Sequence, residues 1–121
     1  MKFLCLAYGD EKDWNALSRE QQEELLAADE RLRRRGALMA AVRPEVTTVR
    51  AWDGVPATSR EPVGSSVLPL AGFSVIEAAD MAEAISLVAA TPCARAKGAI
   101  EIRPLLVINE AEWAARRSGK N

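Results

Sequence analysis

Both sides of the first predicted strand are apolar, and this feature restricts the folds open to the chain more than any other. The strand covers residues 2–8, and its side chains form two alternating sets, Phe3, Cys5 and Ala7 on one side and Leu4, Leu6 and Tyr8 on the other. Successive side chains of a strand point to opposite faces of a sheet, so two apolar sets require cover on both faces. The sequence therefore predicts an inner strand of a sheet that is covered on each side.

The remaining segments give the order of the other elements. Hydrophobic patterning predicts helices capped by Ser18, Asp80 and Asn109, and further strands at 37–43, 46–52, 70–78 and 99–107. Residues 9–17 are expected to form a polar connection, and residues 55–69 an irregular loop with a short edge strand near its start. This order predicts an α+β fold of the ferredoxin-like split βαβ type, with an antiparallel sheet and both helices on one face. We place one domain at residues 1–108 and a short C-terminal helix and tail at 109–121.

The first long helix has both of its ends marked in the sequence. Ser18 is the expected N-cap, and Gln21 stands in the capping-box position three residues later. Acidic residues gather near the start, whereas four arginines lie between 31 and 35, just before Gly36. Because this arrangement matches the helix dipole, we interpret the arginine run as a solvated helix end and not as a nucleic-acid-binding patch.

Charge and composition exclude several classes of function. Sixteen basic and seventeen acidic residues give a net charge of −1, which provides no field for binding nucleic acid or an anionic membrane. The chain has no His, and its two cysteines, Cys5 and Cys93, lack the spacing of a zinc or redox site, so we expect free thiols, no metal and no cofactor. No apolar stretch matches a signal peptide or a membrane span, and we expect a soluble, cytoplasmic protein.

The second apolar face of the predicted sheet needs a partner. Helices on one face leave the side of the first strand that carries Leu4, Leu6 and Tyr8 uncovered, and an exposed apolar surface of that size marks an interaction site. We predict a homodimer in which two sheets pack face to face by two-fold symmetry. The alternative is that Trp113 and the short C-terminal helix fold back over this face of a monomer.

Four segments in order give the chain a resemblance to a known family. They are residues 1–11, Thr47 to Arg50 with Asp53-Gly54, Gly72-Phe73, and Glu101-Ile102-Arg103-Pro104. In order and spacing the chain resembles the YCII-related, or DGPF-domain, family from residue 1 to about residue 106. The resemblance implies a ferredoxin-like dimer of the dimeric α/β-barrel type, with a pocket between helix and sheet. It also implies a family of mostly uncharacterised function, in which some relatives are lyase-like enzymes that use a His and an Asp and others are encoded beside sigma-factor genes.

The chain departs from the family pattern where acid and base groups are expected. In place of the DGPF tetrad and the acidic residue, Lys and acidic residue that follow it, the chain has Arg60-Glu61-Pro62-Val63 and then Gly64 to Leu68. Asp29 stands at the place on the first helix where members often carry a His. The DGPF motif is therefore degenerate, and catalytic function does not transfer to this chain together with the fold.

Asp29 is the candidate catalytic residue. Helical spacing places it in the middle of an apolar stripe with Leu25, Leu26 and Leu32. One interpretation is a general base that faces a pocket and has a pKa raised by burial. The other is a structural carboxylate, paired with Arg33 one turn later or reaching solvent at the edge of the stripe.

Three further residues are candidates for binding a ligand. Glu101 and Arg103 are two positions apart on the last strand and therefore share a face, on the side opposite Ile100 and Ile102. We expect this pair to point toward the cavity of the dimer, where Arg103 would clamp a carboxylate or phenolate; the alternative is a cross-strand ion pair that sets the register. One interpretation of Tyr8 is a hydrogen-bond donor that lines the same cavity. The other is an ordinary tyrosine at the rim of the cavity.

These residues leave three functions open. The first is a cytoplasmic homodimer with a pocket for a small organic acid or a phenol, without demonstrable catalysis. The second is a lyase or isomerase in which Asp29 is the general base. The third is an accessory or regulatory protein that recognises a protein partner through the loop at 55–69.

Overall fold

The computed structural model describes residues 1–64, 67–106 and 111. In chain order the elements are β1 (Lys2–Tyr8), α1 (Glu11–Asn15), α2 (Arg19–Arg34), β2 (Leu38–Ala41), β3 (Thr48–Arg50), β4 (Ala57–Ser59), β5 (Leu70–Glu77), α3 (Met81–Val88), α4 (Pro92–Arg95) and β6 (Ala99–Pro104). The predicted C-terminal helix after Asn109, and with it the alternative that Trp113 covers the sheet, lies outside the described residues. None of the described helices is both long and apolar enough to cross a membrane.

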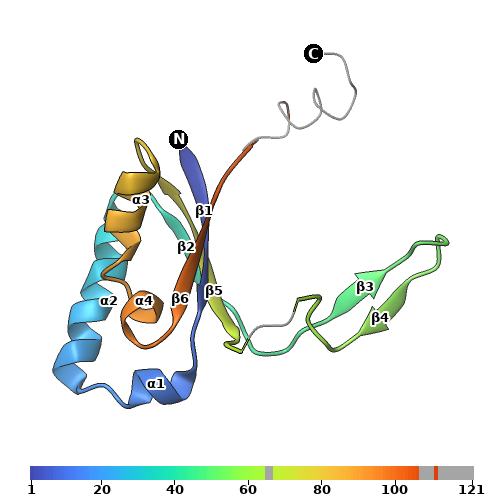
Figure 1. The fold of residues 1–121 in the computed structure, drawn as a ribbon, viewed down its shortest axis with the longest axis horizontal. Helices are drawn as coiled ribbons and strands as arrows, with labels where there is room; N and C mark the ends of the chain where they lie inside the picture. The colour runs from blue at the N-terminus through green and yellow to red at the C-terminus, as the bar shows by residue number, and fades with distance from the viewer. Residues whose placement is uncertain (65–66, 107–110, 112–121) are drawn as a thin grey trace.

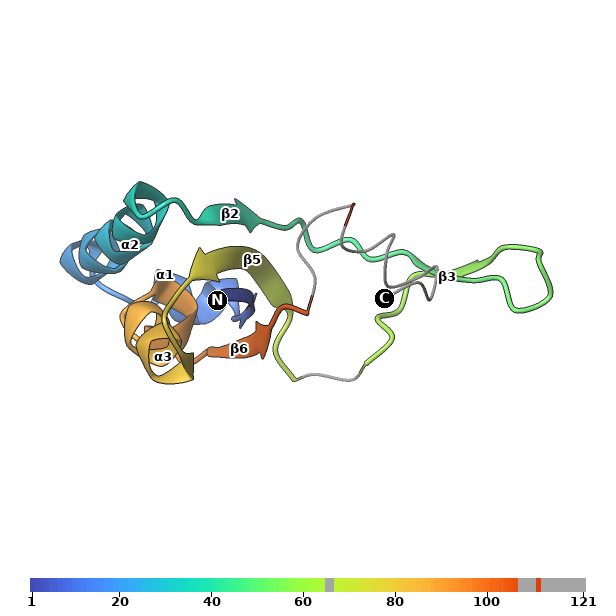
Figure 2. The ribbon, with the colours of Figure 1, turned by 90° about the horizontal axis from the view of Figure 1, so that it is seen from above.

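The main sheet has four strands in the order β2-β5-β1-β6, and every pairing is antiparallel. With the two helical connections, this is the strand order of the split βαβ fold, so the predicted α+β architecture is confirmed. The helices α2, α3 and α4 all lie on the same side of this sheet (Figures 1 and 2). The sheet therefore has a helix-facing side and an open side.

The hydrophobic core lies between the helices and the helix-facing side. Phe3 of β1 and Ile76 of β5 are paired across the two strands and are only 1% and 2% exposed. They pack with Leu32 of α2 and with Ala84 and Val88 of α3. One of the two apolar sets of β1 thus builds the core.

The other set of β1 lies on the open side. Leu4 and Leu6 are only half-buried, and their partners across the strands, Val75 and Phe73 of β5, are half-buried as well. Leu38 of the edge strand β2 is 62% exposed. The described part of the chain supplies no second layer here, so the predicted cover by a second copy remains a prediction.

Hydrogen bonds at both ends of α2 follow the expected pattern. The Ser18 hydroxyl accepts a hydrogen bond from the backbone N–H of Gln21 at 3.1 Å, and the Gln21 side chain accepts one from the N–H of Ser18 at 2.9 Å. The chain leaves the helix through Gly36, whose φ of 97° lies in the left-handed region that favours glycine. The capping box predicted from the sequence is confirmed.

Two short helices depart from the expectations. Asp10 caps α1 by accepting a hydrogen bond from the N–H of Lys12 at 2.9 Å, so part of the connection at 9–17 is helical. Thr91-Pro92 not only follows α3 but also begins α4, because proline fits the first turn of a helix, where its missing N–H has no partner to lose.

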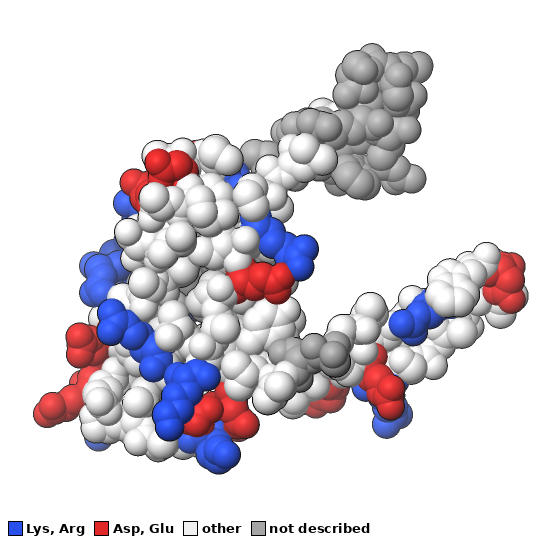
Figure 3. All heavy atoms as spheres, viewed as in Figure 1, with Lys and Arg blue, Asp and Glu red and all other residues white. Residues whose placement is uncertain are grey.

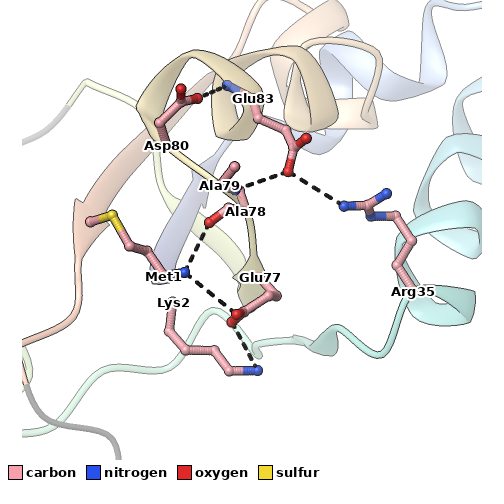
Figure 4. A network of polar contacts seen from close by, with 8 residues as sticks. All are labelled: Met1, Lys2, Arg35, Glu77, Ala78, Ala79, Asp80 and Glu83. Carbon is pink, nitrogen blue, oxygen red and sulfur yellow. Dashed lines mark hydrogen bonds and ion pairs between the residues drawn. The ribbon is translucent and has the colours of Figure 1, made fainter.

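A polar network fastens the start of the chain to the rest of the fold (Figure 4). The ammonium group of Met1 and the side chain of Lys2 each lie 3.4 Å from the carboxylate of Glu77 at the end of β5. Glu83 of α3 pairs with Arg35 after α2 at 3.7 Å. These contacts link the ends of β1, β5, α2 and α3.

The segment between β2 and β5 differs most from the prediction. The strand expected at 46–52 is reduced to β3, which pairs with β4 and not with the main sheet. The turn between them includes Gly54, whose φ is 88°. This hairpin projects away from the body of the molecule (Figures 1 and 2).

Candidate functional site

A cavity of about 280 Å³ lies between α2, the start of α4 and the helix-facing side of the sheet. Most of its lining is apolar. The lining residues that carry polar or sulfur atoms are Cys5, Asp29, Arg33, Met39, Ser74, Thr91 and Cys93. A small apolar space with a few converging polar groups is the usual form of a small-molecule site.

The cavity exists because side chains on the helix-facing side of the sheet become smaller along the strands. At one end, Phe3 and Ile76 fill the space under the helices. At the other end, the lining is made by Ala7, Ala41 and Gly72. Alanine and glycine are too small to reach the helices, so a volume remains that the core does not fill.

The backbone also requires a small residue at Gly72. A Cβ atom at this position would lie 2.7 Å from the carbonyl oxygen of Ala40 on β2. A larger residue would therefore displace the edge strand that forms one wall of the cavity.

Asp29 reaches this cavity from α2. The neighbouring residues Ala28 and Leu32 are buried in the core, and the helical spacing leaves Asp29 half-buried at the cavity wall. Burial raises the pKa of the Asp29 carboxyl group above its ordinary value, and the positive charge of Arg33 partly opposes this effect. Within the described residues, the carboxylate has no hydrogen bond or ion pair.

The alternative of an ion pair between Asp29 and Arg33 is not the arrangement observed. The guanidinium of Arg33 lies 3.5 Å from the carboxylate of Glu30 on the exposed side of the helix. Arg33 nevertheless contributes to the cavity lining, so its charge acts on Asp29 without a direct contact. The assignment of Asp29 as a general base remains a prediction.

Both cysteines line the cavity, which the sequence analysis did not foresee. Burial raises the pKa of the Cys93 thiol, and the negative charge of Asp29, which lines the same cavity, raises it further. Burial also raises the pKa of Cys5, against a hydrogen bond with Ser74 that lowers it. Both are free thiols, as expected. The alternation that places Cys5 beside Phe3 could have indicated its side of the sheet; nothing local indicates the place of Cys93.

The other predicted site residues lie across the sheet from Asp29. Tyr8, Glu101 and Arg103 fall on the open side of β1 and β6, together with Leu4 and Leu6, and none of them lines the cavity. Arg103 donates a hydrogen bond from Nε to a carboxylate oxygen of Glu101 at 2.9 Å. The expectation that Asp29 and these three residues share one pocket is therefore wrong for the single chain, because the sheet stands between them.

The Glu101–Arg103 pair also differs from the predicted alternative. The two residues are neighbours along one face of β6, so the ion pair lies within one strand and does not cross to another. In the single chain the Arg103 side chain is 65% exposed and the Glu101 side chain 41% exposed. Their predicted role in ligand binding stays a prediction that belongs to the open side. In Figure 3, an acidic and a basic patch lie next to each other on the side of the sheet away from the helices.

The described residues contain no group of three or more His, Cys, Asp or Glu side chains placed to hold a metal ion. The chemistry available in the cavity is therefore that of one carboxylate, one guanidinium, two thiols, one thioether and two hydroxyl groups. These groups can accept a proton, donate hydrogen bonds and orient a small polar molecule.

A solved structure with a similar fold is 5-chloro-2-hydroxyhydroquinone dehydrochlorinase from Burkholderia phenoliruptrix AC1100, in complex with 2,5-dihydroxybenzoquinone. The two chains are 16% identical, with a TM-score of 0.51, over 87% of this chain and 93% of the other. At this level of identity, the similarity shows a common fold.

A comparison with curated proteins gives no match. The family model described as the YCII-related domain matches residues 1–109, which is nearly the whole chain. The match covers all the described elements that form the cavity. The chain therefore belongs to the YCII-related domain family.

Proposed function

We propose that this protein is a cytoplasmic homodimer that binds a small phenol or hydroxylated ring acid in the cavity beside α2. The observation that carries the proposal is Asp29, a half-buried carboxylate without a hydrogen-bond partner among the described residues, at the wall of a mostly apolar cavity. Burial removes part of the hydration of this carboxylate, and a ligand hydroxyl that donates a hydrogen bond to it would replace the lost water.

The size and the charges of the cavity support this class of ligand. A volume of about 280 Å³ is at the lower end of the range for small-molecule sites and suits a single ring. Asp29 accepts a hydrogen bond from a hydroxyl group, and Arg33 provides a positive charge for a carboxylate or phenolate on the same molecule. The bound ring in the Burkholderia dehydrochlorinase complex, 2,5-dihydroxybenzoquinone, is of comparable chemistry.

The open side of the sheet supports the homodimer. It carries half-buried apolar side chains on β1 and β5 and an exposed Leu38 on β2. A second copy packed by two-fold symmetry would bury the same surface on both chains. The two free thiols fit a reducing compartment and thus support a cytoplasmic location.

A lyase or isomerase activity is the second candidate, and one observation favours it. The raised pKa of Asp29 makes this carboxylate a stronger base than an exposed aspartate, and its place in the cavity would bring it within reach of an acidic proton of the ligand. The base would remove a proton from a hydroxyl group or from a carbon next to a carbonyl group.

Binding can be tested by calorimetry and thermal shift with a panel of dihydroxybenzenes and hydroxybenzoates. We expect a subset to raise the Tm of the wild-type protein, and Asp29→Asn to weaken their binding at least about tenfold, which corresponds to about 1.4 kcal/mol. Glu24→Gln is the matched control, because it makes the same change of charge on the exposed side of α2, away from the cavity lining.

The results separate the possibilities. Binding that is unchanged in Asp29→Asn would contradict the cavity as the site. Loss of binding in Arg103→Ala with retention in Asp29→Asn would move the site to the open side. An acidic limb of a pH–rate profile that disappears in Asp29→Asn would support the enzyme.

A further inference from the structure

The hairpin formed by β3 and β4 is isolated from the rest of the chain. We call residues 46–64 the arm. Figures 1 and 2 show that the arm projects from the sheet on the side away from the helices. Within the described residues, every hydrogen bond made by this segment stays inside it, including Thr48 to the carbonyl oxygen of Glu61 at 2.6 Å and the N–H of Val55 to Asp53 at 3.0 Å.

The arm exposes several large apolar side chains to solvent. Trp52 near its tip is 91% exposed, and Val49, Val55 and Val63 are each more than half exposed. A hairpin of two strands is at best marginally stable in water, and here each strand has only three residues. The arm therefore needs a surface to pack against.

The position of the arm determines which surface this can be. The arm rises on the open side of the sheet, as seen in Figures 1 and 2. Any molecule that covers Leu4, Leu6 and the rest of the open side must therefore lie alongside the arm. The two uncovered apolar surfaces of the chain are thus arranged to contact the same partner.

A second copy of the chain would cover both the open side of the sheet and the apolar side chains of the arm. Under two-fold symmetry, each chain offers its open side to the other and each arm reaches the partner. The charges allow this contact, because the arm carries both signs, for example Arg50 and Asp53, and the open side carries the Glu101–Arg103 pair. The net charge of −1 adds little repulsion between copies.

We propose that the arm embraces a second copy of the chain and buries Trp52 against it. This inference rests on the homodimer of the proposed function and adds a contact that the packing of two sheets does not require. It also assigns a role to the segment that replaces the DGPF motif, since Arg60 to Val63 form the returning side of the arm.

The first test uses Trp52 as the sole tryptophan, in a Trp14→Phe, Trp113→Phe background. We expect light scattering to give twice 13.1 kDa and the Trp52 emission to be shifted to the blue, with acrylamide quenching several-fold weaker than that of free N-acetyltryptophanamide. Dilution to monomer should move the emission back to that of an exposed indole.

Three results would contradict the inference, and each would do so in a different way. A dimer in which Trp52 is quenched like the free indole would overturn the arm contact and leave the homodimer intact. A monomer at high concentration with an exposed Trp52 would overturn both. A monomer with a protected Trp52 would show that the arm packs on its own chain, which also contradicts the inference.

A second test changes the arm itself. The double substitution Val49→Ser, Trp52→Ser should raise the dissociation constant of the dimer at least tenfold while the far-ultraviolet circular dichroism of the body is retained. Ile85→Ser is the matched control, because Ile85 is a similarly exposed apolar residue on α3, on the opposite side of the molecule. Equal dissociation constants for the arm variant and the control would refute the contact.

Discussion

Asp29 loses hydration when the chain folds, and it lies at the wall of the cavity proposed to bind a ligand. The periodicity of α2 requires that a residue four positions before Arg33 and three before the buried Leu32 lie at the edge of the core. A carboxylate at that position loses solvation without gaining a hydrogen bond from the described residues, and its pKa rises. A titratable group at a cavity wall whose pKa is shifted by desolvation is a candidate for binding or catalysis.

The raised pKa of Asp29 predicts how stability depends on pH. As the pH increases, the unfolded chain releases this proton first, so stability falls between the ordinary pKa of aspartate and the raised pKa of the folded state and stays reduced above it. Asp29→Asn should therefore raise Tm at pH 7 by about 2–6 °C, and the difference should vanish in acid. Thermal unfolding from pH 3 to 8 measures this. A lower Tm of the variant at pH 7 would contradict the predicted destabilisation by charged Asp29, and Glu24→Gln on the exposed side of α2 serves as the control.

For Glu77 we expect the opposite dependence of stability on pH. Partial loss of solvation raises its pKa, but the hydrogen bond from Lys2 and the charge of the N-terminal ammonium group outweigh this and hold the pKa of Glu77 below its ordinary value. The folded state is therefore favoured above the ordinary pKa of glutamate, and this contribution is lost as the pH falls through the lowered pKa.

The change Glu77→Gln should accordingly lower Tm at neutral pH, by less than the gain in Asp29→Asn, since the Glu77 side chain is largely exposed. The two curves should meet in strong acid, and 1 M salt should reduce the difference at pH 7. Identical melting curves at low salt would show that the network in Figure 4 adds no stability.

At the scale of elements, the cavity depends on small side chains at one end of the helix-facing side. Ala7→Leu on β1 should fill part of the 280 Å³ and reduce ligand binding at least about tenfold without a large loss of stability, because the added carbons enter free space. Calorimetry with a ligand from the phenol panel measures this. Ala27→Leu on the exposed side of α2 is the control; equal binding by both variants would place the ligand elsewhere.

The elements that could be predicted from sequence are those with local signals. The two apolar sets of β1, the Ser18–Gln21 capping box and the Asp80 cap each act within a few residues, and the fold built on them is confirmed. The isolation of β3 could not be predicted, because alternation marks a strand without naming its partner.

The family resemblance implies a pocket between helix and sheet, but the residues that line it could not be predicted, for a related reason. The decrease in size from Phe3 through Cys5 to Ala7 is visible in the sequence, but its meaning depends on the distance between helix and sheet. The presence of Cys93 and Asp29 in the same cavity lining likewise depends on how α4 packs on α2, which no local pattern encodes. Alternation along β6 correctly places Glu101 and Arg103 opposite Ile100 and Ile102, and a pocket shared with Asp29 within one chain is incompatible with that side of the sheet.

At the scale of the whole molecule, the two faces of the main sheet differ. The helices cover one face, and no described element forms a layer on the other. The helices bury Phe3 and Ile76 almost completely, whereas the open side and the arm leave apolar side chains in contact with solvent. Both features lie on the same side of the sheet (Figures 1 and 2). In a homodimer, the second copy would cover the open side and contact the arm. The cavity would remain on the helix-facing side of each copy.

The Glu101–Arg103 pair tests that assembly, because it lies on the edge strand β6 of the open side that the second copy would cover. In the proposed interface, Arg103→Glu would place two like charges next to each other away from water, where disruption of a charge pair costs about 2 kcal/mol or more. We expect the dissociation constant to increase at least about 30-fold, measured by sedimentation. The exchanged pair Glu101→Arg, Arg103→Glu should restore the dimer, because it returns both charges to the same face of β6. An unchanged dissociation constant in Arg103→Glu would mean that the open side stays in water when the chain assembles.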